Sequence, residues 1–149
     1  MQLHEISVEW KRFDNFFALW KLHRGCTQLV YVIGEAHHCY VGSIGSRDGK
    51  KGLGTRYQWQ YVNRARAIFG LEENQGQVAY AGTLKKPSGS FLGMDILAVE
   101  ADVQNAFVLA YGPENALFDP EDLAEGYAFT HSGELPGFLG SDLQRKQTL

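Results

Sequence analysis

Residues 29–45 read LVYVIGEAHHCYVGSIG, and the rest of the chain is interpreted around them. Val, Ile and Tyr dominate two short runs, Gln28 to Ile33 and Cys39 to Ile44, and these residue types favour strands. The segment between the runs contains a glycine and two histidines and suits a turn. The stretch therefore predicts a tight antiparallel hairpin that carries Tyr31 on its first strand and Tyr40 on its second.

Length and composition indicate one globular domain spanning residues 1–149. Apolar residues make up 44% of the chain and charged residues 21%, which is ordinary for such a domain. No run approaches the ~18 apolar residues of a membrane span, and charges interrupt the N-terminus where a signal peptide would be apolar. We therefore expect a cytoplasmic protein that does not contact membranes. Cys26 and Cys39 are expected to be buried thiols in that compartment.

Charge is distributed unevenly along the chain, although the net charge is only −3. Residues 46–86 contain eight Lys/Arg against three Asp/Glu, whereas residues 87–149 contain two Lys/Arg against ten Asp/Glu. A basic middle suits contact with a phosphate backbone, and the acidic remainder would repel one. A solvated surface with chance clustering of charge is the alternative.

Patterns elsewhere predict further elements. Ile6, Val8 and Trp10 alternate with polar residues and indicate a short strand before the hairpin. Capping and apolar spacing then predict three helices and one strand. These cover Asn15 to Arg24 (helix), Arg56 to Phe69 (helix), Gln77 to Leu84 (strand) and Asp95 to Tyr111 (helix). The segment 116–149 is acidic and rich in turn residues. We expect parts of it to pack against the rest of the chain through Leu123, Tyr127, Phe129 and Phe138.

Glu100 breaks the pattern of its own predicted helix, because it falls between Ile96 and Val103 on the apolar face. A carboxylate there is costly unless it is paired, hydrogen-bonded or bound to a metal. Two explanations stay open from the residues alone. One is a buried ion pair, for example with Arg56, and the other is a metal site in a cleft.

The order β–β–α–β–α, with Tyr31 and Tyr40 on the hairpin, resembles the GIY-YIG nuclease family over residues 28–115. Arg56 opens the first core helix, Glu100 lies in the second, and Asn115 follows it. Leu29 and Val41 stand where the family's two motifs have glycine and isoleucine. The resemblance implies an α+β fold, α/β sandwich-like, with a small antiparallel three-stranded sheet flanked by helices.

The same resemblance implies a metal-dependent endonuclease that hydrolyses phosphodiester bonds of DNA. Glu100 would hold Mg²⁺ or Mn²⁺, and Arg56 would bind the scissile phosphate. Tyr31 would act as general base or position the water beside Tyr40, while Asn115 would be architectural. All five are expected to meet on one concave surface.

The basic, glycine-rich segment after the hairpin is the expected contact with DNA. Flexible backbone and clustered cations allow a loop to follow a phosphate strand. The residues assigned to this contact are Arg47, Lys50, Lys51, Gln60 and Arg64. A homodimer or a larger complex would have to supply sequence specificity, since no separate DNA-reading motif is recognisable.

Two other classes of function fit the sequence. The chain could be a nucleic-acid-binding module of the same fold without turnover, or a protein-interaction domain whose acidic tail binds a basic partner. Metal-dependent nicking separates the nuclease from both, and DNA binding separates the two alternatives from each other.

Overall fold

The computed structural model describes residues 3–23, 28–34, 39–45, 78–85, 93–143 and 147–148. Within these residues, six strands form one mixed sheet in the order β3-β2-β4-β1-β5-β6. The strands are β1 (His4–Phe13), β2 (Gln28–Ile33), β3 (Tyr40–Gly45), β4 (Ala79–Lys85), β5 (Tyr127–Gly133) and β6 (Gln147–Thr148). The helices are α1 (Phe16–His23), α4 (Gly93–Tyr111) and α5 (Gly140–Leu143), with short 3₁₀ turns η2 (Pro113–Asn115) and η3 (Gly137–Leu139).

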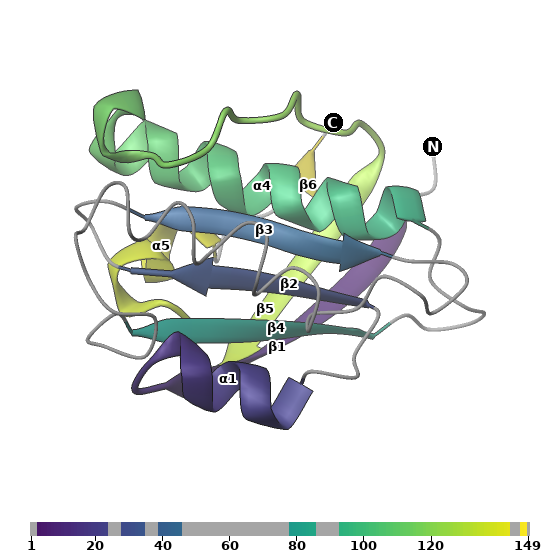
Figure 1. Ribbon diagram of the computed structural model, residues 1–149. Helices are drawn as coiled ribbons and strands as arrows, with labels where there is room; N and C mark the ends of the chain where they lie inside the picture. The colour runs from purple at the N-terminus through teal and green to yellow at the C-terminus, as the bar shows by residue number, and fades with distance from the viewer. Residues whose placement is uncertain are drawn as a thin grey trace.

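The predicted hairpin is confirmed, and it forms one side of the sheet. β2 pairs antiparallel with β3, with Tyr31 opposite Gly42, and β2 also pairs antiparallel with β4. Helix α4 lies over one face of the sheet and α1 lies over the other (Figure 1). Both faces of β2 are therefore covered, which explains why its residues from Leu29 to Ile33 are all apolar or aromatic.

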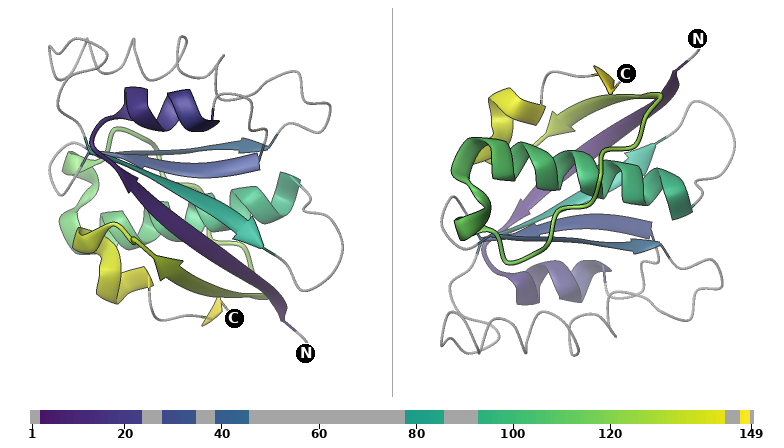
Figure 2. Two further views of the ribbon diagram at one scale, coloured as in Figure 1. Left: turned by 90° about the horizontal axis from the view of Figure 1, so that it is seen from below. Right: turned by 90° about the horizontal axis from the view of Figure 1, so that it is seen from above.

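The expected three-stranded sheet is wrong, although the α+β class is correct. β1 pairs antiparallel with β4 and parallel with β5, so segments 1–27 and 116–149, which the family resemblance does not cover, add strands to the sheet. Figure 2 shows β1 and β5 running side by side beyond β4. The physical reason is that β1 has its own apolar face: Ile6, Val8 and Trp10 are buried, while the residues between them are exposed.

The hydrophobic core has one part on each side of the sheet. On the α4 side, Val30, Val32 and Val41 cluster with apolar residues of α4, β1 and β5. On the α1 side, Phe16 packs against Tyr31, with their ring centroids 5.8 Å apart. The pleat of each strand thus decides which partner helix a residue meets.

Candidate functional site

The two hairpin tyrosines lie together on the α1 side of the sheet. Their ring centroids are 6.0 Å apart. Tyr31 is only 1% exposed, whereas Tyr40, at the start of β3, is partly exposed. The structure therefore brings together the two residues that the sequence pattern paired.

The rings of Tyr31 and Tyr40 both pack against Gly42. A Cβ added at Gly42 would lie 2.7 Å from both Cζ and Oη of Tyr31, and 2.9 Å from Cε1 of Tyr40. Real side chains essentially never approach so closely. The Tyr-Val-Gly sequence of the second strand thus has a steric cause: the phenol of Tyr31 crosses over residue 42, and only glycine leaves room for it.

Glu100 is buried on α4, as its position on the apolar face predicts, with 8% of its surface exposed. Its Oε2 accepts a hydrogen bond from the hydroxyl of Ser43 at 2.7 Å. Its Oε1 accepts a longer hydrogen bond, of 3.4 Å, from the side-chain amide of Gln104. Two neutral donors from β3 and α4 therefore contribute to stabilising the buried carboxylate.

The expectation that Glu100 and the tyrosines share one concave surface is wrong. Gly42 and Ser43 are neighbours in β3, so their side-chain positions point to opposite faces of the sheet. The Gly42 position meets the tyrosines, whereas Ser43 meets Glu100. The tyrosine pair therefore lies on the α1 side and the Glu100 carboxylate on the α4 side, with strand β3 between them.

Asn115 closes the end of α4 and covers part of β3. Its side-chain amide donates to the backbone carbonyl of Tyr111 at 2.8 Å. Its backbone carbonyl accepts from the N–H of Cys39 at 3.0 Å. The N–H of Leu117 donates to the carbonyl of Cys39 at 2.8 Å, completing a short parallel bridge at Ala116. These contacts are architectural, and they fix the start of β3 against the segment that follows α4.

Several predicted site residues lie outside the described residues. They are Arg56, with the helix it was expected to open, and the proposed DNA contacts Arg47, Lys50, Lys51, Gln60 and Arg64. The alternative ion pair between Glu100 and Arg56 falls outside them as well.

The described residues around Glu100 provide only some of the oxygen ligands that a hard cation needs. Among the described residues, no three His, Cys, Asp or Glu side chains are grouped closely enough to hold a metal ion. One carboxylate nevertheless matches Mg²⁺, which commonly takes one or two carboxylates and fills its remaining positions with water and phosphate oxygens. Glu100 therefore suits a metal ion whose other ligands are mainly water and substrate oxygens.

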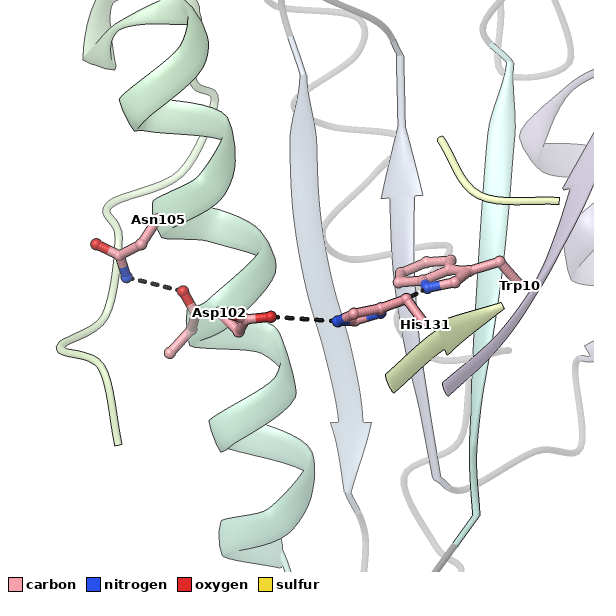
Figure 3. A network of polar contacts seen from close by, with 5 residues as sticks. Trp10, Asp102, Asn105 and His131 are labelled. Carbon is pink, nitrogen blue, oxygen red and sulfur yellow. Dashed lines mark hydrogen bonds and ion pairs between the residues drawn. The ribbon is translucent and has the colours of Figure 1, made fainter. Parts of the chain in front are cut away.

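A polar network that the sequence analysis missed joins β1, β5 and α4 (Figure 3). The indole N–H of Trp10 donates to Nδ1 of His131 at 3.0 Å, and Nε2 of His131 lies 3.2 Å from Oδ2 of Asp102. An indole nitrogen can only donate, so Nδ1 must be the acceptor and Nε2 carries the proton toward Asp102. Asp102 is partly buried where it meets His131.

A second polar pair lies at the other end of the same contact between α4 and β5. The hydroxyl of Tyr127 donates to Asp95 at 3.0 Å, and Asp95 is 2% exposed. Burial, followed by the hydrogen bond and charge of Asp95, raises the pKa of Tyr127 to about 12. Spacing places Asp95 and Asp102 on one side of their helix, and Tyr127 and His131 on one face of their strand, but it does not identify their partners.

Cys39 is a free thiol and is fully buried, as expected for a reduced cysteine. Burial raises the pKa of this thiol well above its ordinary range. Cys39 packs within the hydrophobic core.

Comparison with known proteins identifies no relative, since no family model, no curated protein and no solved structure matches this chain. Among the described residues, no helix combines the length and the apolar character needed to cross a lipid bilayer.

Proposed function

We propose that this chain is a metal-dependent endonuclease that acts on DNA in the cytoplasm, similar to GIY-YIG nucleases. The observation that carries the proposal is the packing of Tyr31 and Tyr40 around Gly42. Ordinary strand tyrosines need no glycine beneath them, so this arrangement gives the two-tyrosine motif a physical basis. The order of β2, β3, β4 and α4, and the antiparallel pairing of the three strands, also agree with the resemblance.

The proposal puts the scissile phosphate at the outer edge of β3, near Gly42 and Ser43. β3 is the terminal strand of the described sheet, so its two faces meet at that edge. The Tyr31 hydroxyl lies over Gly42 on the α1 side, and Glu100 meets Ser43 on the α4 side. This arrangement replaces the single concave surface expected from the sequence.

Each residue then has a separate role at that edge. Glu100 would bind Mg²⁺ or Mn²⁺, and the ion, when bound, would neutralise charge that develops on the phosphate. Tyr31 would orient the attacking water or accept its proton, while Tyr40 would hold the phenol of Tyr31 in place. Arg56 and the basic segment 46–86 would contact phosphate oxygens, Arg56 with its planar fork of donors.

Nicking of supercoiled plasmid tests the proposal. The protein is incubated with plasmid in Mg²⁺, in Mn²⁺ or in EDTA, alongside the variants Tyr31→Phe and Tyr40→Phe. Tyr111→Phe is the matched control, because its hydroxyl bonds the carbonyl of Phe138, which lies in the segment after β5. We expect nicking in either metal and none in EDTA, a loss of about 10²-fold or more in Tyr31→Phe, and little change in the control. Equal rates in Tyr31→Phe and Tyr111→Phe would contradict the role of Tyr31.

The second candidate is a nucleic-acid-binding module without turnover. One observation favours it: Glu100 accepts hydrogen bonds from Ser43 and Gln104, so it can be a structural carboxylate across the sheet from the tyrosines. DNA binding that depends on salt, with no nicking in any metal, would support this candidate over the nuclease.

A further inference from the structure

We propose that Gln104 is a positioning residue that orients the Glu100 carboxylate, and that the segment after α4 fixes Gln104 in turn. This inference rests on the proposed nuclease function and deepens it. It assigns a role in the site to residues 116–126, a segment that the family resemblance leaves outside.

The side-chain amide of Gln104 is 3% exposed and touches three parts of the chain. Its Nε2 lies 3.4 Å from Oε1 of Glu100 and 3.3 Å from the carbonyl oxygen of Val41 in β3. Its Oε1 accepts the backbone N–H of Glu121 at 2.9 Å. One buried side chain therefore connects α4, β3 and the segment that crosses α4.

The contact with Glu121 decides which way the amide points. A backbone N–H can only donate, so the oxygen of Gln104 must face residue 121. The –NH₂ group must then face Glu100 and Val41, where it meets two acceptors. With the amide reversed, a donor would oppose the backbone N–H, and an oxygen would oppose the carboxylate.

The carboxylate is thus bonded by a separate donor at each oxygen. Ser43 donates to Oε2 from the strand, and Gln104 donates to Oε1 from the next turn of the helix. Residues that hold a metal ligand by hydrogen bonds set its orientation, and losing one commonly lowers metal affinity by about 10–100-fold. We infer that Gln104 has this effect on Glu100.

Asn105 offers a matched control, because it holds the same segment without touching Glu100. Its side-chain amide donates to the carbonyl of Glu121 at 2.7 Å and to the carbonyl of Ala101 at 2.8 Å. Gln104→Met and Asn105→Leu each replace an amide by an apolar side chain of similar size. Both loosen the segment at residue 121, but only Gln104→Met removes a donor from Glu100.

The experiment measures Mn²⁺ binding to the DNA-free protein by electron paramagnetic resonance, together with thermal melting. We expect both variants to melt earlier than wild type. Gln104→Met raises the half-saturating Mn²⁺ concentration about 10-fold, whereas Asn105→Leu leaves it unchanged. Equal increases in both variants, or none in Gln104→Met, would overturn the positioning role.

A metal-free measurement separates failure of this inference from failure of the proposed function. Wild-type protein that nicks no plasmid in either Mg²⁺ or Mn²⁺ overturns the proposed function. In ¹H–¹⁵N spectra without metal, Glu100→Gln should shift the side-chain amide resonances of Gln104. Unmoved resonances overturn the positioning role, whatever the metal result.

Discussion

At the scale of single residues, Gly42 is the position where the packing of the tyrosine pair most strictly limits the residue type. Its missing side chain is the space that the Tyr31 ring occupies. The ring cannot move aside easily, because it is buried and packs on Phe16. The glycine of the motif is thus set by packing and not by a turn.

Gly42→Ala should therefore destabilise the fold by about 1–3 kcal/mol, the usual cost of overpacking a rigid site. Gly140→Ala is the control, since Gly140 has helical φ and ψ and no atom within 4 Å of an added Cβ. Urea unfolding measures both. A control-like result for Gly42→Ala would show that Tyr31 does not lie across residue 42.

Tyr127 should make the protein sensitive to alkali. Its pKa is about 12 in the folded state, against about 10 for a free phenol, so the folded protein holds this proton more tightly. The resulting stabilisation is fully present below pH 10 and is lost as the pH rises toward 12. Melting temperature measured between pH 8 and pH 12 should fall less steeply in Tyr127→Phe than in wild type. Parallel curves would contradict the assignment.

At the scale of elements, the contact between β5 and α4 was the least predictable part of the fold. Tyr127, Phe129 and His131 alternate along β5 and face inward, but His131 counts as polar in any hydrophobic pattern. Its burial makes sense only once Trp10 and Asp102 satisfy both ring nitrogens. Those partners are more than 25 residues away in the chain, so no local pattern could reveal them.

Asp102→Ala should cost about 1–3 kcal/mol, because it leaves the buried Nε2–H of His131 without its acceptor. Asp102→Asn should be milder, since its amide oxygen can still accept that hydrogen bond. Asp122→Ala, at an exposed position, serves as the surface control and should change the free energy of unfolding by less than about 0.5 kcal/mol. An equal loss of unfolding free energy in Asp102→Ala and Asp122→Ala would contradict a structural role for the contact between Asp102 and His131.

The sequence also could not predict which hairpin residues face α4 and which face α1. Both faces of β2 are buried, so hydrophobicity cannot say which residues meet α4 and which meet α1. Because a shift of one residue moves a side chain to the other face, the sequence could not show that Glu100 and the tyrosines meet opposite faces of β3. The hairpin, α1, α4 and the position of Glu100 on the apolar face of α4 did follow from local patterns, whereas the meeting of the two tyrosines was implied by the family resemblance.

At the scale of the whole molecule, the family-like core of residues 28–115 is not the whole folding unit. β1 lies between β4 and β5, and it contributes Ile6, Val8 and Trp10 to the core on the α4 side. Without it, β4 would lose its neighbour on that side and α4 would lose much of the surface it covers.

A fragment limited to residues 28–115 should therefore fail to fold cooperatively. Circular dichroism and ¹H–¹⁵N spectra, compared with those of the full chain, measure this directly. A fragment with dispersed resonances and a sharp thermal transition would contradict the view that β1 and β5 are integral to the domain.

The central claim is that a nuclease site uses Glu100 as its metal ligand, and one variant tests it most directly. Glu100→Gln is nearly isosteric, and its amide oxygen can still accept from Ser43. Its –NH₂ group then faces the –NH₂ group of Gln104, so we expect a loss of about 1–3 kcal/mol. A carboxylate that neutralised a buried cation would instead cost about 3–5 kcal/mol on removal.

The measurement is the rate of plasmid nicking in Mg²⁺ by Glu100→Gln, normalised to the folded fraction found by thermal melting. We predict a folded protein that still binds DNA with the salt dependence of wild type and has lost metal-dependent nicking. A variant that nicks as fast as wild type per folded molecule would contradict the account.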